Sequence, residues 1–417
     1  MINVKFIYLY LFLSISIFQT GIAQNYIDDY LAEAANNNPG LKSKFNDYMA
    51  SLEKVPQVGA LPDPQVTFGY FIQPVETRVG PQKARISASQ MFPWFGTLGA
   101  RKDAATEMAK SKYEQFEDSK SRLFYDVKST YYNLYFTGKG VDITLENINI
   151  LNIFRKLALI KVESGLASSV DVLRVEMEIA DLENQLALLR DNQLVLQTAF
   201  NNLLNVDDLR AVSLPDSLEN KDFDLTREAA LDSLHTRNHQ LSQIEHMAAS
   251  YDQQELVARR AGKPSLMLGI DYMVIGKSSN SMLSASESGK DAIVFPMVGI
   301  SIPLYRKKYT AMVKEAVLMQ ESVKNNKENQ TNLLETTFEK GNRDYQDADR
   351  RIKLYQAQSI RADKALSILQ TAYETDGKNF EEVLRMERQL LKYKLELEKA
   401  RADKDAATAF LNYIIGK

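Results

Sequence analysis

Apolar and polar residues alternate along four short stretches of the chain. In the first stretch the apolar residues Val66, Phe68, Tyr70 and Ile72 alternate with Gln65, Thr67 and Gly69. Alternation with a period of two indicates a strand whose two faces differ in polarity. The pattern predicts strands at about 64–75, 84–93, 264–275 and 291–303. Each has roughly the 9–12 residues that a tilted strand needs to cross a bilayer.

Long helical patterns follow each pair of strands. Apolar residues recur at three- and four-residue steps, which predicts helices at about 97–160 and 169–204, and again at 307–375 and 379–415. Gly165 and Gly377 stand where the first helix of each pair ends, a common place for glycine. At 1.5 Å per residue the longer helices extend roughly 95 Å. Shorter helices precede the strands at about 25–55, with a break near Asn38-Pro39, and at 226–260.

The chain contains the same unit twice. The matching positions are Pro64 with Pro264, Gly69 with Gly269, Pro93 with Pro303, and 171–176 with 382–387. Each copy has the order helix, strand, strand, long helix, helix, so the sequence predicts a first repeat at 24–205 and a second at 226–417. The irregular, acidic segment 206–225 connects them. The extra residues of the second copy fall in the polar segment 276–291, where a solvent-exposed loop is expected.

The first 23 residues resemble a secretory signal peptide. Lys5 precedes an apolar core at 6–18, and small residues at 21–23 suit cleavage before Gln24. An uncleaved N-terminal anchor helix is the alternative, but the polar residues directly after Ala23 favour cleavage. We therefore expect an exported protein.

Composition and charge exclude several classes of function. The net charge of −3 does not indicate a basic surface that would bind a nucleic acid. The chain has no cysteine and therefore no disulfide or thiol nucleophile. His235, His239 and His246 are the three histidines. The first two would share a face of one helix and could bind a divalent metal, but incidental surface histidines are the favoured interpretation. No P-loop or dinucleotide fingerprint is present, so we expect no enzyme, no cofactor and no metal site.

Four strands cannot close a membrane barrel alone, because the smallest barrels have about eight. An open sheet edge leaves backbone groups unsatisfied in lipid, so strands that enter a membrane would require the chain to oligomerise. The junctions at Pro93, Gly96 and Pro303 would then join barrel wall to helical wall. Proline removes a ladder donor and suits a first helical turn.

The chain resembles the TolC family of outer-membrane efflux proteins over about 28–415. The resemblance rests on the order, doubling and spacing of Asn38-Pro39 with Leu41, LPDPQ at 61–65, FPWFG at 92–96, IPLY at 302–305, and Gly165 and Gly377 with their following Asp/Glu-Val-Leu runs. It implies a mostly α fold and a homotrimer. Four strands from each chain would build one transmembrane β-barrel, continuous with an α-helical periplasmic tunnel. It also implies a periplasmic adaptor and an inner-membrane pump, of the RND type, as partners.

At the periplasmic tip that the resemblance implies, Asp171 and Glu382 are candidates for an acidic ring at the pore entrance. Arg174 and Arg385, one turn further on, would pair with them as a latch. First-turn stabilisation of the helix dipole and solvated ion pairs are the alternatives. Candidates for adaptor docking are Gly165, Val172, Leu173, Gly377, Val383 and Leu384, with ordinary helix packing as the alternative for the apolar residues.

Aromatic residues flank the strand ends: Phe68, Tyr70, Phe92, Trp94, Phe295 and Tyr305. They predict an aromatic girdle at the lipid interface, with a buried soluble core as the alternative. Two functions follow. The first is a passive outer-membrane channel of a tripartite efflux system, with heavy-metal cations or drugs as cargo and a lean toward metals from the acidic tip. The second is an exported coiled-coil scaffold or adaptor without a barrel. The sequence does not identify the cargo, the pump or the adaptor.

Overall fold

A computed structural model describes residues 26–207, 209–278, 288–376 and 379–417. The signal-peptide prediction, Gly377 and part of the polar loop 276–291 lie outside these residues. Among the described residues, no helix combines the length and the apolar character that crossing a membrane requires.

The same order of elements occurs twice, and the predicted mostly helical fold with four antiparallel strands is confirmed. The elements of the first copy are α2 (Tyr26–Asn37), α3 (Pro39–Gly59), β1 (Gln65–Thr77), β2 (Gly80–Phe92), α4 (Thr97–Glu163) and α5 (Ser169–Leu204). Those of the second are α6 (Arg227–Arg237), α7 (His239–Ala261), β3 (Ser265–Ile275), β4 (Ala292–Ser301), α8 (Arg306–Asp376) and α9 (Phe380–Ile414).

Two compact units divide the chain differently from the two repeats. The first, here the helical unit, comprises residues up to Lys42, Lys120–Ala230 and Thr336–Lys417. The second, here the strand unit, comprises Ser43–Ser119 and Leu231–Glu335. Each unit takes material from both repeats, and α4 and α8 run through both. The repeats are therefore not independent domains of the structure.

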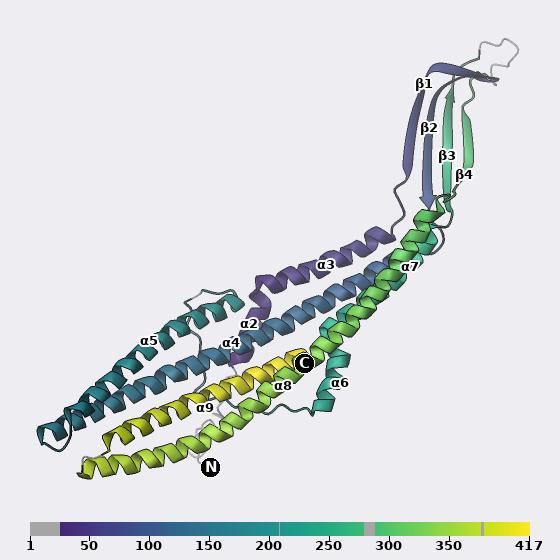
Figure 1. Cartoon of the computed structure of the whole chain (residues 1–417). Helices are drawn as coiled ribbons and strands as arrows, with labels where there is room; N and C mark the ends of the chain where they lie inside the picture. Colours follow the sequence, from purple (N-terminus) through teal and green to yellow (C-terminus); the bar gives the residue numbers. More distant parts are fainter. Residues whose placement is uncertain (1–25, 208, 279–287, 377–378) are drawn as a thin grey trace, which may run out of the picture. The chain divides into compact units, whose positions relative to one another are not determined.

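The strand unit contains one four-stranded antiparallel sheet in the order β1-β2-β3-β4 (Figure 1). Consecutive residues of a strand point to opposite faces, and directly paired residues share a face. Phe68 pairs with Ile86, and Ile86 pairs with Tyr272, so these residues share one apolar face. Thr67 pairs with Ser87, and Ser87 pairs with Asp271, on the opposite, polar face.

Asparagine interrupts the short helices in both copies. The Asn38 side chain accepts a hydrogen bond from the backbone N–H of Leu41, and that of Asn238 accepts from Gln240 and Leu241. Asparagine satisfies N–H groups that the first helical turn leaves without partners. The second break was not expected, because position 239 carries histidine where the first copy has proline. The two copies therefore share the asparagine cap and not the proline.

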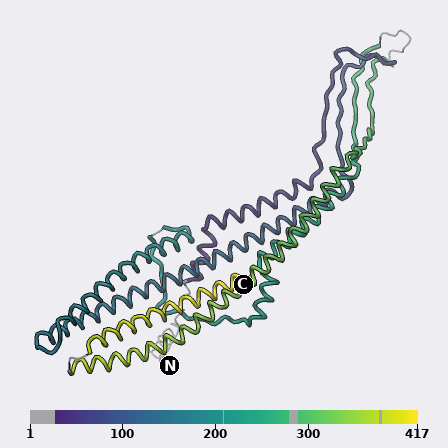
Figure 2. Tube along the Cα trace, in the orientation of Figure 1, coloured from purple at the N-terminus to yellow at the C-terminus, as the bar shows by residue number. Residues whose placement is uncertain are grey.

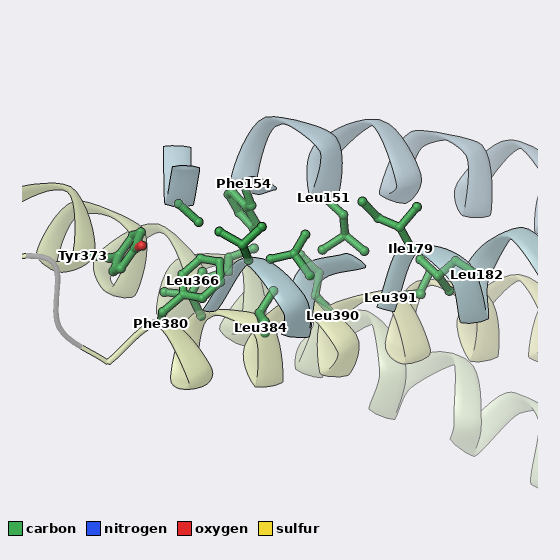
Figure 3. Packing of buried hydrophobic residues seen from close by; sticks show 14 of the residues in the cluster. Leu151, Phe154, Ile179, Leu182, Leu366, Tyr373, Phe380, Leu384, Leu390 and Leu391 are labelled. Carbon is green, nitrogen blue, oxygen red and sulfur yellow. The ribbon is translucent and has the colours of Figure 1, made fainter. Parts of the chain in front are cut away.

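In the helical unit, α5 and α9 return antiparallel to α4 and α8, and both begin at the same end of the unit (Figures 1 and 2). The core at this end is apolar and draws on all four helices (Figure 3). The connector contains no helix or strand in its described residues, but it packs firmly. Arg210 forms a two-pronged ion pair with Glu33, and Lys404 binds both Asp222 and Asp349.

Candidate functional site

The turn between α4 and α5 is fixed by backbone geometry at Gly165. This residue has a φ of 70°, in the left-handed region that favours glycine. The Leu166 N–H donates to the Lys161 carbonyl at 2.8 Å, and the Gly165 N–H donates to the Val162 carbonyl at 3.0 Å. These are the two bonds of a Schellman motif, which satisfies the last carbonyls of the helix. Ser168 then caps α5 by accepting from the Val170 N–H at 3.2 Å.

Charged residues cluster where α5 and α9 begin, and we call Asp171, Arg174, Glu381, Glu382 and Arg385 the tip cluster. The Arg174 guanidinium lies 3.6 Å from the Asp171 carboxylate and 3.1 Å from that of Glu381. Arg385 pairs with Glu382 one turn away. Arg174 therefore links the two helical hairpins. Glu381 was missed because a pair between helices leaves no spacing signal in the sequence.

Both predicted carboxylates occupy the third position of a helix, where negative charge favours the helix dipole. The Asp171 side chain is mostly covered, whereas the Glu382 side chain is 44% exposed. The structure pairs each with its own arginine and shows no contact between the two. Asp171 and Glu382 can therefore stabilise the first turns of their helices and also contribute to a pore entrance.

The residues predicted to dock an adaptor divide into buried and exposed ones. Val172, Val383 and Leu384 lie in the apolar core of the tip, where their side chains pack within the chain as the helix-packing alternative expects. Leu173 is 57% exposed, and Gly165 has open space around it. Of the docking candidates that the structure describes, these two keep the accessibility that a docking contact requires.

A buried lysine ties the ends of α4 and α8 together beneath the tip cluster. Lys161 donates to the Glu374 carbonyl at 3.0 Å and lies 5.2 Å from the centre of the Tyr373 ring. Tyr373 stacks obliquely on Phe380 at a ring separation of 4.6 Å (Figure 3). Burial raises the pKa of Tyr373, and the nearby Asp171 carboxylate adds to the effect. The helical ends therefore form a closely packed support for the charged residues.

A buried carboxyl group lies further along α9. Glu387 is 2% exposed and accepts from the Asn147 amide at 2.7 Å, but its other oxygen has no hydrogen-bond partner among the described residues. Burial raises the pKa of Glu387, the charge of Lys394 lowers it, and Glu146 and Asp363 raise it. Ionised Glu387 is therefore destabilising in the folded chain.

The Glu387→Gln variant should be more stable at neutral pH. Because the folded-state pKa is raised, the stability present below the ordinary glutamate pKa is lost as pH rises through the folded value. The amide keeps the acceptor for Asn147 without the charge, so we expect a gain of about 1–3 kcal/mol at pH 8 that disappears near pH 4. Thermal unfolding followed by circular dichroism at both pH values measures this. A variant that is less stable at pH 8 would contradict the assignment.

The strand–helix junction of the first copy depends on Gly96. Pro93 ends β2, and Gly96 adopts a φ of 73° immediately before α4. The Gly96 carbonyl accepts from Arg260 of α7 and from the Ala100 N–H. In the second copy Pro303 lies between β4 and α8, but Arg306 occupies the position equivalent to Gly96. Both prolines mark the junction, whereas the glycine turn belongs to the first copy.

The apolar face of the sheet is bare within the chain. The residues predicted to meet lipid are all strongly exposed: Val66, Phe68, Ile72, Val298 and Ile302. Ile72 reaches 90%. Of the predicted girdle, Phe68, Tyr70, Phe295 and Tyr305 are also strongly exposed, and Trp94 is 39% exposed beside Phe95. No buried β core exists among the described residues, so the soluble-core alternative does not fit this sheet.

The histidines lie on two helices rather than one. His235 lies in the last turn of α6, whereas His239 begins α7 after the Asn238 cap, so the expected shared face is wrong. Each histidine instead contacts a glutamate of another helix: His235 with Glu335, His239 with Glu114 and His246 with Glu107, at 2.7–2.8 Å. Within the described ranges, no three His, Cys, Asp or Glu side chains gather closely enough to hold a metal ion.

Residues 30–206 match the family model described as outer membrane efflux protein. No curated protein matches the chain. Among solved structures, CusC is 17% identical with a TM-score of 0.76 and covers 94% of this chain and 92% of its own. VceC of Vibrio cholerae is 14% identical (TM-score 0.75; 94% and 96% covered), and the open state of MtrE of Neisseria gonorrhoeae is 16% identical (0.76; 94% and 88%). At these identities the likeness establishes the fold.

Proposed function

We propose that the chain is one subunit of a trimeric outer-membrane export channel, and this proposal is supported by the match of residues 30–206 to the family model described as outer membrane efflux protein. The channel conducts passively cargo that an inner-membrane pump of the RND type delivers through a periplasmic adaptor. Three chains supply one barrel of strands and one tunnel of helices.

One observation carries this proposal. The sheet is open, because β1 and β4 each pair on one side only among the described strands, and its apolar face is bare. A soluble protein rarely leaves such an edge and such a face uncovered. In a trimer, lipid would cover the apolar face, and β1 would pair with β4 of the next subunit. The open edges and the bare face would then both be satisfied. The alternative of a periplasmic scaffold leaves both unsatisfied.

The full chain, extracted from membranes in detergent, tests the proposal. The expected result is a particle with three times the mass of the chain, which produces stepwise conductance in planar bilayers. A water-soluble monomer with no conductance would overturn it and favour the scaffold.

The tip cluster supports a selective entrance in this trimer. Threefold symmetry turns Asp171 and Glu382 into six carboxylates, and a ring of carboxylates attracts cations and repels anions. The exposed pairs of Arg174 with Glu381 and of Arg385 with Glu382 each contribute about 0.2–1 kcal/mol, and three copies of each act together on the closed state. We propose that they hold the entrance closed at rest. Leu173 and the open space at Gly165 are the docking surface for the adaptor.

Replacing Asp171 with Asn and Glu382 with Gln should reduce the preference of the channel for cations severalfold. The amides keep the size of the carboxylates but remove six negative charges from the trimer. Reversal potentials in a salt gradient across a planar bilayer measure the preference. Glu183→Gln is the matched control, since this exposed carboxylate lies about three turns further along α5. Equal cation preference in the double variant and the wild type would exclude the entrance role.

A further inference from the structure

An open hollow lies beside the strand–helix junction, within the strand unit, and we call it the junction hollow. Its volume is about 310 Å³, at the lower end of the range typical of small-molecule sites. The sheet contributes Met91, Ser265 and Ser301 to its wall. Met91 pairs with Met267, and Ser265, two residues before Met267, pairs with Ser301. All three therefore belong to the polar face, on which Asp271 also lies.

The junction hollow is strongly basic. Four of its lining residues are cationic: Arg101 of α4, Arg260 of α7, Lys263 before β3 and Lys308 of α8. No aspartate or glutamate is among the described residues that line it. In the described ranges, none of the four cations lies within ion-pair distance of a carboxylate. Positive charge gathered in a concave surface without counter-charges favours a negatively charged ligand.

The guanidinium of Arg260 is held in place by the junction itself. It donates to the Gly96 carbonyl, and a Cβ atom at position 96 would stand 3.0 Å from the Nη1 atom of Arg260. Glycine therefore lets the guanidinium lie directly against the turn. The bond to Gly96 leaves other N–H groups of the guanidinium available, and their planar arrangement matches the paired oxygens of a phosphate or carboxylate.

The first residue of α4 adds a polar group without a partner. Thr97 lines the hollow and is 2% exposed, and its hydroxyl has no hydrogen-bond partner among the described residues. Buried hydroxyl groups nearly always have one. The start of α4 also carries the positive end of a helix dipole, which favours an anion. An oxyanion in the hollow would supply a partner and a counter-charge at this part of the wall.

Aromatic side chains lie next to the cations. Trp94 and Tyr309 both line the hollow, and Met312 adds an apolar thioether. The Lys308 ammonium lies 5.7 Å from the centre of the Tyr309 ring. Trp94 is 39% exposed, so its ring is accessible to a ligand. The wall therefore suits a molecule that joins an oxyanion to a compact apolar or aromatic body.

We propose that the junction hollow binds the phosphate or carboxylate group of an amphipathic organic anion in the lumen of the channel. The inference names a class of ligand that the proposed function leaves open, and it rests on that function only for the statement that the polar face lines the lumen. The tip cluster does not exclude such a ligand, because its three carboxylates and two arginines leave a net charge of −1 per chain. A metal cation would meet four positive charges in the hollow and no carboxylate.

Titration with phenyl phosphate tests the proposal on the full chain in an uncharged detergent. Trp94 is the single tryptophan of the sequence, so tryptophan fluorescence reports directly on the hollow. We expect a saturable change with phenyl phosphate and a weaker one with inorganic phosphate, which lacks the ring. Benzylamine, which has the ring and the opposite charge, should cause none. Equal changes with benzylamine and phenyl phosphate would overturn the assignment.

Two double variants remove the same charge from adjacent positions. R101Q/K308Q removes two cations that line the hollow and should weaken phenyl phosphate binding about five- to tenfold, because charge-assisted hydrogen bonds are the strong ones. The matched control is K102Q/K307Q, since Lys102 and Lys307 are exposed neighbours on the same helices and do not line the hollow. Its affinity should stay within about twofold of the wild type, because solvent and salt screen exposed charges. Equal losses in both variants would show a general charge effect and overturn the site.

A lipid headgroup is the other source of a phosphate group. In nanodiscs, replacing part of the phosphatidylcholine with phosphatidylglycerol should not compete with phenyl phosphate, because the hollow lies on the polar face. Competition would overturn the lumenal placement.

The channel and the hollow can fail separately. Normal conductance in planar bilayers, together with wild-type affinity in R101Q/K308Q, would reject the hollow and keep the channel. Phenyl phosphate binding by a monomer without conductance would support the hollow and reject the channel.

Discussion

Ile86→Arg should abolish assembly of the proposed trimer in membranes, whereas Ser87→Arg should leave it intact. The two residues are neighbours near the middle of β2 and point to opposite faces. Ile86 lies between Phe68 and Tyr272 on the apolar face, and Ser87 lies beside Asp271 on the polar face. Arginine on the lipid side of a barrel costs about 2–4 kcal/mol at the midplane, so three copies cost about 6–12 kcal/mol. On the polar face the new arginine would lie beside Asp271, which already pairs with Arg85, so it would face a charged and polar surface and not lipid.

Fractionation of cell membranes and the particle mass in detergent distinguish the two variants. Ile86→Arg should be lost from the membrane fraction or remain monomeric, and Ser87→Arg should match the wild type. The adjacent positions make the comparison strict, since strand, charge and side-chain size are the same. If both arginines are tolerated, the apolar face does not meet lipid. If both are rejected, the variants report a general intolerance of the strand and the assignment of faces fails.

The strands and the long helices could be predicted from the sequence, because each depends on a local pattern of apolar and polar residues. The strands alternate because one face is bare and apolar, and the long helices carry apolar residues at regular steps. The limits of β2 were less accurate, since it begins at Gly80 and not near 84. The two strands continue through polar residues to a tight turn after Thr77, where alternation no longer marks them. Gly80 itself has a φ of 136°, which the turn requires.

Contacts between helices were not readable, because the rotation of one helix against another is not encoded in the spacing of either. Burial of Val383 and Leu384 follows from this rotation, and so does the pairing of Arg174 with Glu381.

Gly341 in α8 has a clear packing reason. A Cβ atom there would stand 2.8 Å from the Phe410 ring and 3.1 Å from Leu411. Leu411 is fully buried and has no open space to move into, whereas Phe410 is partly exposed and lines an open pocket beside Gly341. Gly341 therefore allows α8 and α9 to approach closely, at a helix-propensity cost of about 1 kcal/mol relative to alanine.

Gly341→Leu should destabilise the helical unit by about 3 kcal/mol or more, the upper end expected for overpacking. The matched comparison uses alanine at two glycines. At Gly138 a Cβ atom meets only Leu214 at an ordinary 3.8 Å, so Gly138→Ala should gain up to about 1 kcal/mol from helix propensity. Gly341→Ala should lose stability despite the same gain. Thermal unfolding of the three variants measures the signs, and a stabilised Gly341→Ala would show that α8 and α9 do not pack as closely as the structure has them.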